Sequence, residues 1–103
     1  MFGFSYADIC LSALTRQVVC NARCVRLKPT GFNMLVFLME NAEQIVSRES
    51  LLFNVWGYSF DPGTKILEVQ LNYLRKNLVT LQSSIVIQTI RGRGLRLYRS
   101  DVR

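Results

Sequence analysis

The chain has 103 residues, of which 50% are hydrophobic and 19% charged, a composition that fits one globular domain and excludes a disordered protein. No apolar run approaches the roughly 20 residues of a membrane span. The N-terminus, MFGFSYADIC, also lacks the basic and then apolar layout of a signal peptide. We therefore expect a cytoplasmic protein with no membrane partner.

The net charge of +6 is concentrated in the last third of the chain. Residues 1–64 contain five basic and five acidic residues, whereas residues 65–103 contain eight basic residues against Glu68 and Asp101. One-sided positive charge favours an anionic partner, with nucleic acid ahead of a membrane surface. A membrane-binding segment would need a basic amphipathic helix with bulky apolar residues opposite.

Residues 1–28 are predicted to form an antiparallel sheet, because apolar residues alternate in ICLS, RQVVC and RCVRL between the turn-like ALT and NAR. Cys20 and Cys24 flank NAR, so they could face each other across a hairpin. With Cys10 they are the only cysteines, and without histidine they make a poor zinc set. Such thiols are most often small apolar strand residues, so we expect no metal or other cofactor.

Residues 29–80 are predicted to hold three helices. Pro29 suits the first position of a helix, where its missing N–H is harmless. The first helix then buries apolar residues at helical spacing, namely Phe32, Leu35, Leu38 and Met39. Ser47 is a good N-cap for a second helix, which Gly57 ends. The buried stripe of that helix is predicted to be Leu51, Leu52, Val55 and Trp56.

The turn chemistry of YSFDPG predicts a loop before the third helix. That helix is expected over residues 64–78, with one narrow apolar stripe of Leu67, Leu71, Leu74 and Leu78. Its opposite face carries Lys65, Val69, Asn72, Tyr73 and Lys76. Amides, exposed methyl groups and cations are the groups that read base edges in a major groove. The alternative is that Val69 and Tyr73 pack under the hairpin or against another chain.

The segment IVIQTIRGRGLRLY predicts a β-hairpin over residues 85–98, with Gly92 supplying a positive φ at the turn. One interpretation of its arginines is a solvated hairpin. The other is a narrow finger, with Arg91 and Arg93 entering a minor groove and Arg96 tracking phosphates. Adjacent like charges favour the finger, because they cost energy without a polyanion. Strands, three helices and a basic hairpin define an α+β winged helix-turn-helix, expected as a single domain over residues 1–103.

These residues also carry a family resemblance. VSRESLLFNVWG, the helix ending in LRKNL, and IQTIRGRG followed by LRL closely resemble the effector domain of OmpR/PhoB-type response regulators. The resemblance implies a four-stranded N-terminal sheet and covers nearly the whole chain, without a phosphoacceptor receiver domain. The chain is then either an excised domain or a natural protein controlled by its abundance or by a partner.

The resemblance implies DNA binding, with the third helix in the major groove and the hairpin, or wing, in the minor groove. Trp56 and Thr89 match positions that contact the DNA backbone, although a large aromatic such as Trp56 is usually a core residue. The loop over residues 58–63 matches one that touches RNA polymerase, which makes Tyr58, Ser59, Phe60 and Asp61 candidate partner contacts. The candidate DNA contacts are Trp56, Lys65, Val69, Asn72, Tyr73, Lys76, Thr89, Arg91, Arg93 and Arg96.

Several positions depart from the family pattern. The family opens its first helix with Thr and an acid three residues later, where this chain has Lys28 and Gly31. Restoring that capping box is expected to stabilise the fold by about 1 kcal/mol. Leu95 replaces the wing aromatic, and Asn72 and Tyr73 replace basic residues, so the site preference of relatives does not transfer.

The leading functional prediction is sequence-specific binding of double-stranded DNA by a transcription regulator of a two-component system. The domain would be a monomer when free and would pair on tandem half-sites. The alternative is a protein-interaction module on the same fold, which bridges to RNA polymerase or sequesters a related regulator. We expect no enzyme, because the chain has no histidine, metal set or carboxylate pair placed for acid–base work.

Overall fold

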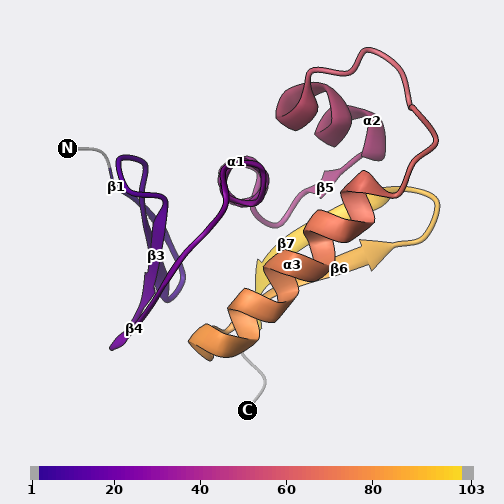
Figure 1. The fold of residues 1–103 in the computed structure, drawn as a ribbon. Helices are drawn as coiled ribbons and strands as arrows, with labels where there is room; N and C mark the ends of the chain where they lie inside the picture. Colours follow the sequence, from indigo (N-terminus) through magenta and orange to yellow (C-terminus); the bar gives the residue numbers. More distant parts are fainter. Residues whose placement is uncertain (1–2, 101–103) are drawn as a thin grey trace.

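Four short antiparallel strands open the fold in the computed structural model, which describes residues 3–100 (Figure 1). The first two residues of the expected sheet region and residues 101–103 lie outside the described residues. The strands are β1 (Gly3–Tyr6), β2 (Ile9–Ser12), β3 (Gln17–Cys20) and β4 (Arg23–Arg26), and they pair in that order. Their alternation buries one face of the sheet through Ile9, Leu11, Val18 and Cys20, as a half-buried sheet requires.

Cys20 and Cys24 do not face each other across the hairpin of β3 and β4, the arrangement that the sequence left open. The register places Cys20 opposite Arg23 and Val19 opposite Cys24, so Cys20 is buried and Cys24 is exposed on the other face. The reason is the turn, which has two residues instead of the three in NAR and starts at Asn21 with a φ of 54°. A register shift of one residue moves every side chain to the opposite face.

The first helix, α1 (Pro29–Glu40), starts at the predicted proline. The four predicted core residues of α1 are buried, and Met34 is buried with them. A short strand, β5 (Ile45–Val46), leads to α2 (Arg48–Leu51), where the Ser50 N–H donates to Ser47 Oγ at 3.1 Å, the N-cap that we predicted. From Leu52 the helix continues as a π-helical turn, η1 (Leu52–Trp56), and ends at Gly57 with a φ of 79°.

The predicted buried stripe of the second helix is only partly confirmed. Leu51 and Leu52 are buried, whereas Val55 and Trp56 are half-buried at the edge of the core. Leu52, Val55 and Trp56 lie within the π-helical turn, which departs from the 3.6-residue spacing on which the prediction rested.

The third helix, α3 (Ile66–Leu81), is shifted toward the C-terminus of the predicted range over residues 64–78. Its start is delayed because Arg48 Nη2 donates to the Thr64 carbonyl oxygen at 2.9 Å, which holds Thr64 in the preceding loop. The predicted leucine stripe is fully buried, and Leu81 extends it. This face of α3 contacts β4, α1 and β6.

The wing consists of β6 (Ile85–Ile90) and β7 (Gly94–Arg99), joined by a tip over residues 91–93. Together with β5 it forms a second antiparallel sheet in the order β5-β7-β6, beside α3 (Figure 1). Gly92 has the predicted positive φ, 75°. Gly94 has a φ of 142°, and a Cβ there would overlap the carbonyl oxygen of Val46. Only glycine therefore fits at this position, where β7 lies against β5. Within residues 3–100, none of the helices has the length and hydrophobicity needed to cross a membrane.

The start of α1 explains the missing capping box. The Lys28 side chain makes no cap hydrogen bond, and the Lys28 N–H instead donates to Tyr73 Oη at 2.9 Å. A Cβ on Gly31 would lie 2.6 Å from Tyr73 Cε2. Replacing Lys28 by Thr and Gly31 by Glu would therefore displace a packed ring, and the structure opposes the stabilisation that we expected from this change.

The N-terminal sheet is tied to the end of α3 by Asp8. Ser83 Oγ donates to Asp8 Oδ1 at 2.8 Å, and the Ser84 N–H donates to Oδ2 at 2.7 Å. Burial raises the pKa of Asp8, but the hydrogen bonds from Ser84 and Ser83 outweigh burial and leave the pKa below its ordinary value.

Replacing Asp8 by Asn should lower the free energy of unfolding at pH 7 by about 1–3 kcal/mol, because acceptors for two donors are weakened. A carboxylate with a lowered folded-state pKa contributes stability above its unfolded pKa of about 3.9, and this contribution is lost as the pH falls through the folded pKa. The difference between parent and Asp8→Asn in urea unfolding should therefore shrink below about pH 4. A difference of equal size at pH 7 and pH 3 would contradict this, and Glu40→Gln, at an exposed position, is the control.

Candidate nucleic-acid interface

The outward face of α3 presents most of the predicted side chains to solvent. Lys65, Asn72 and Lys76 are exposed, and Val69 is 61% exposed. Nothing within residues 3–100 covers Val69, so it does not pack under the wing. A leucine stripe on the inner side and a mixed apolar, amide and cationic face on the outer side give α3 one surface available to a partner.

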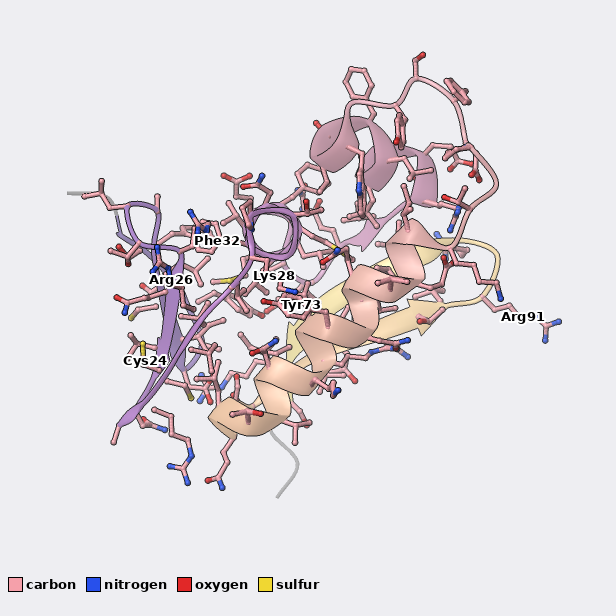
Figure 2. The ribbon with its side chains drawn as sticks, viewed as in Figure 1. Cys24, Arg26, Lys28, Phe32, Tyr73 and Arg91 are labelled. Atoms are coloured by element: carbon pink, nitrogen blue, oxygen red, sulfur yellow. The ribbon has the colours of Figure 1, made fainter. Side chains whose placement is uncertain are left out.

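Tyr73 is placed differently from the other candidates on α3. Its ring is half-buried against Gly31 of α1, and Lys28 Nζ lies 6.0 Å from the ring centroid (Figure 2). Its hydroxyl already accepts the hydrogen bond from the Lys28 N–H. Tyr73 therefore joins two helices, and the structure gives no support to a direct contact with a base or phosphate.

Arg75 makes the main polar contact between α3 and the wing. Its Nε and Nη2 donate to the Ile87 carbonyl oxygen at 3.1 and 2.6 Å, and Nη2 also donates to Thr89 Oγ1 at 3.2 Å. The predicted candidate Thr89 is exposed, but its hydroxyl is held by this arginine. Sequence analysis missed Arg75, whose only signal was a cation adjacent to the leucine stripe.

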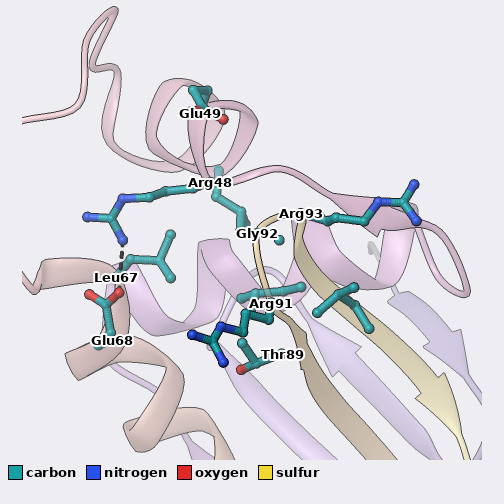
Figure 3. Close-up of a pocket in the computed structure, with 12 residues that line it drawn as sticks. Arg48, Glu49, Leu67, Glu68, Thr89, Arg91, Gly92 and Arg93 are labelled. Atoms are coloured by element: carbon teal, nitrogen blue, oxygen red, sulfur yellow. Dashed lines mark hydrogen bonds and ion pairs between the residues drawn. The ribbon is translucent and has the colours of Figure 1, made fainter.

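The wing tip carries the two exposed arginines that we predicted as its groove contacts. Arg91 and Arg93 point to different sides of the tip (Figure 3), and neither side chain has a hydrogen bond or ion pair to another described residue. Arg96 is half-buried along β7, with its guanidinium carbon 4.6 Å from the centroid of the Tyr98 ring. Arg96 Nη1 also donates to Gln88 Oε1 at 3.4 Å, so this arginine is less available than the pair at the tip.

Arg48 organises the loop before α3. Its Nε donates to Asp61 Oδ2 at 2.8 Å, and its Nη1 donates to Glu68 Oε2 at 2.9 Å (Figure 3 shows the second pair). The hydrogen bond from Arg48, followed by one from the Gly63 N–H, lowers the pKa of Asp61. Bonding to Asp61 in turn raises the pKa of Arg48. The predicted partner contact Asp61 is exposed, but its carboxylate is paired with Arg48 of the same domain, and Glu68 is paired at the margin of the α3 surface.

A hollow separates the wing tip from the first turn of α3 (Figure 3). It is lined by Arg91 and Arg93 on the wing and by Leu67 and Glu68 on α3. The tip and the first turn of α3 therefore border one space, and an occupant that reaches one of them also lies near the other.

Trp56 is both a packing residue and part of a groove. It is half-buried against the core, and it lines a shallow depression together with Thr30, Lys65 and Val69. The packing of Trp56 agrees with its interpretation as a core residue, and the depression that it lines also brings it beside Lys65 and Val69.

An exposed aromatic surface lies on η1 and the following loop. Phe53 is 60% and Phe60 67% exposed, and the ring centroids of Tyr58 and Phe60 are 6.1 Å apart. Exposed Ser59 lies between the latter two. Sequence analysis predicted Tyr58, Ser59 and Phe60 as partner contacts but missed Phe53, because that prediction rested on the loop over residues 58–63 and Phe53 precedes it on η1.

Two sheets, a helix with one exposed polar face and a hairpin with an arginine tip define a winged helix-turn-helix domain. Residues 22–97 match the family described as "Transcriptional regulatory protein, C terminal". The chain belongs to this family, the effector domains of OmpR/PhoB-type regulators, which are not enzymes.

Curated relatives and solved structures agree with this assignment. The chain is 34% identical to the response regulator MprA of Mycobacterium leprae over 89% of its own length, and 33% identical to the transcriptional regulatory protein YkoG of Bacillus subtilis over 87%. It spans 40% of the length of each relative. The DNA-binding domain of Klebsiella pneumoniae RstA, solved in complex with the RstA box, superposes with a TM-score of 0.79 at 27% identity. That match covers 95% of this chain and 98% of the RstA chain.

Replacing Arg75 by Ala should lower the free energy of unfolding by about 1–3 kcal/mol, because the Ile87 carbonyl oxygen loses a charged donor. Lys76→Ala removes the neighbouring but exposed cation and should change stability by no more than about 0.5 kcal/mol. Urea denaturation of both variants measures the difference. Equal stabilities for the two would show that Arg75 does not hold α3 to the wing.

Proposed function

We propose that this domain binds double-stranded DNA sequence-specifically as the effector of a transcription regulator. In this proposal α3 enters the major groove and the wing tip enters the adjacent minor groove. The observation that supports it most is that the first turn of α3 and the exposed arginines of the tip border the same hollow, while Lys65, Val69, Asn72 and Lys76 are exposed on the outer face of the same helix. The RstA domain was solved with its own DNA box, which supports carrying this mode of binding over to the present chain.

The proposed roles follow from exposure and chemistry. Asn72 can form paired hydrogen bonds to an adenine edge, and Val69 can contact a thymine methyl group. Lys65 and Lys76 flank these two residues as phosphate contacts. Arg91 and Arg93 enter the minor groove, while Trp56, Thr89 and Arg96 contact the backbone near it. Tyr73 is left out of this surface because its hydroxyl and ring are occupied within the domain.

Electrostatics supports the same surface. No acidic residue occurs between Glu68 and Asp101, and Arg48 neutralises Glu68. A polyanion that approaches α3 and the wing therefore meets more cations than acids, with the exposed Glu49 as the other carboxylate that borders the hollow. Counterion release from its phosphates favours binding. We also propose that the domain acts in the cytoplasm, where a DNA-binding regulator of the two-component type would meet its DNA.

A second candidate function is binding to another protein such as RNA polymerase. The exposed rings of Phe53, Tyr58 and Phe60 favour it, because large aromatic side chains exposed together are enriched at protein interfaces. Arg48 fixes one end of the loop that carries two of these rings. None of these rings lines the hollow beside the wing tip, so both functions can coexist.

Arg91→Ala and Arg93→Ala should each weaken DNA binding while leaving folding nearly intact, because the tip buries little surface. Loss of one phosphate contact lowers the magnitude of the slope of log K against log salt by about 0.9. Loss of a minor-groove contact should also weaken the preference for narrow, A·T-rich grooves. We expect the larger effect from Arg91, which matches the wing arginine of the family.

Asn72→Ala should instead change which bases are preferred, with a smaller effect on the salt slope. Binding titrations at three or more salt concentrations, on sites selected from a random DNA pool, separate the two kinds of contact. Arg26→Ala is the control of equal charge, since Arg26 is exposed on β4 in the other sheet. If both tip variants bind like Arg26→Ala, the wing does not contact DNA.

The domain should be a monomer in solution and should bind DNA as two copies on tandem half-sites about one helical turn apart. Half-sites at this spacing place both copies on one side of the duplex, where they can contact each other. Sedimentation of the protein alone, and with duplexes carrying one or two half-sites, measures the stoichiometry. A tight dimer without DNA would contradict this prediction and would favour the protein-interaction alternative.

A further inference from the structure

We propose that Tyr73 and Gly31 form a matched pair that sets the position of α3 on α1 and thereby the base preference of the domain. Tyr73 is then a positioning residue, which acts through α3 and does not itself contact DNA. This inference rests on the proposed function, because it concerns how the DNA-contacting helix is held.

The contact is close and is made mainly by the ring of Tyr73, with Gln70 Oε1 3.3 Å from the position of a Cβ added to Gly31. The ring of Tyr73 occupies the space above Gly31 so fully that an added Cβ would lie 2.6 Å from Cε2 and 2.8 Å from Cδ2 (Figure 2 shows Tyr73 between the two helices). Distances below 3.0 Å require that the ring moves. Glycine at this place in α1 costs about 1 kcal/mol in helix propensity relative to alanine, so the sequence accepts an unfavourable residue where the ring lies.

The hydroxyl of Tyr73 anchors the same contact at a second point. It accepts the hydrogen bond of the Lys28 N–H, at the junction between β4 and α1. The Lys28 carbonyl oxygen accepts the first helical bond, from the Phe32 N–H at 2.9 Å. Tyr73 therefore connects α3 to the point where the N-terminal sheet leads into α1, a point at which no side chain caps the helix.

The position of Tyr73 on α3 links this contact to DNA recognition. Val69 lies one turn before Tyr73, Lys76 lies one turn after it, and Asn72 is its neighbour. On a rigid helix, a shift of Tyr73 moves all three exposed side chains together. Recognition of bases requires the side chains of Val69, Asn72 and Lys76 to be held to within about 0.5 Å. The position of the Tyr73 ring on Gly31 should therefore influence which bases these side chains reach.

A double-mutant cycle tests the pair. Gly31→Ala should lower the ratio of specific to non-specific DNA affinity about tenfold, which corresponds to about 1.4 kcal/mol. The same change in a Tyr73→Leu background should have little further effect, because the ring that the new Cβ displaces is gone. Tyr73→Phe keeps the ring and removes only the hydrogen bond, so we expect a loss of about threefold to fivefold. The salt slope should not change in any of these variants, because no phosphate contact is removed.

The matched control is Asn33→Ala, an exposed position two residues further along α1 that gains helix propensity. If Tyr73 contacts DNA directly, its substitutions will weaken binding by the same factor whichever residue occupies position 31, which overturns the proposal. If the pair serves only stability, melting temperatures will fall while the affinity ratio, measured well below them, stays at the parent value. That result also overturns it.

A measurement on the free protein separates failure of this inference from failure of the proposed function. If the parent prefers no sequence over random DNA, the proposed function is wrong. Amide NMR shifts along α3 then still report on the pair. Gly31→Ala should shift them in the parent and much less in Tyr73→Leu. Equal shifts in both backgrounds would show that Gly31 and Tyr73 do not position the helix together.

Discussion

Burial of one face of α3 is the constraint on which the rest of the structure depends. Its leucine stripe contacts β4, α1 and β6, so a single helix closes the core between the two sheets. Each buried leucine contributes about 1.5–3 kcal/mol, so the leucines of the stripe together contribute far more than any single polar contact described above. Because the stripe is narrow, its burial also decides which residues face outward. The position of Asn72 and Val69 at the surface is thus a consequence of the hydrophobic core.

Hydrophobic burial is not directional, and three polar side chains supply the missing orientation. Arg75 fixes α3 against the wing, Arg48 fixes the loop before α3, and Tyr73 fixes α3 against α1. Two of the basic residues are therefore used inside the domain, which leaves Lys65, Lys76 and the tip arginines for a partner. Net charge alone overstates the cationic surface that is available to DNA.

The sequence predicted the elements governed by local chemistry. The N-cap Ser47, the end at Gly57 and the wing turn at Gly92 follow from rules that need only neighbouring residues. The outward residues of α3 followed from the leucine period. Contacts between distant segments were not predictable, because Arg48 reaches residues 13 and 20 positions away in the chain and Arg75 reaches 12. The cysteine register also failed, since one residue in a turn decides it.

The role of Tyr73 can be interpreted only when α1 and α3 are considered together. On a helical projection it lies beside Asn72 and belongs to the exposed face, and its type suits an interface. Two features take Tyr73 out of the exposed face. Gly31, 42 residues earlier in sequence, has no side chain and leaves space for the ring, and the Lys28 N–H donates to the Tyr73 hydroxyl. The family's capping box makes the start of α1 self-sufficient. Here the same point is bound to α3, so a change at the start of α1 is transmitted to the helix proposed to read DNA.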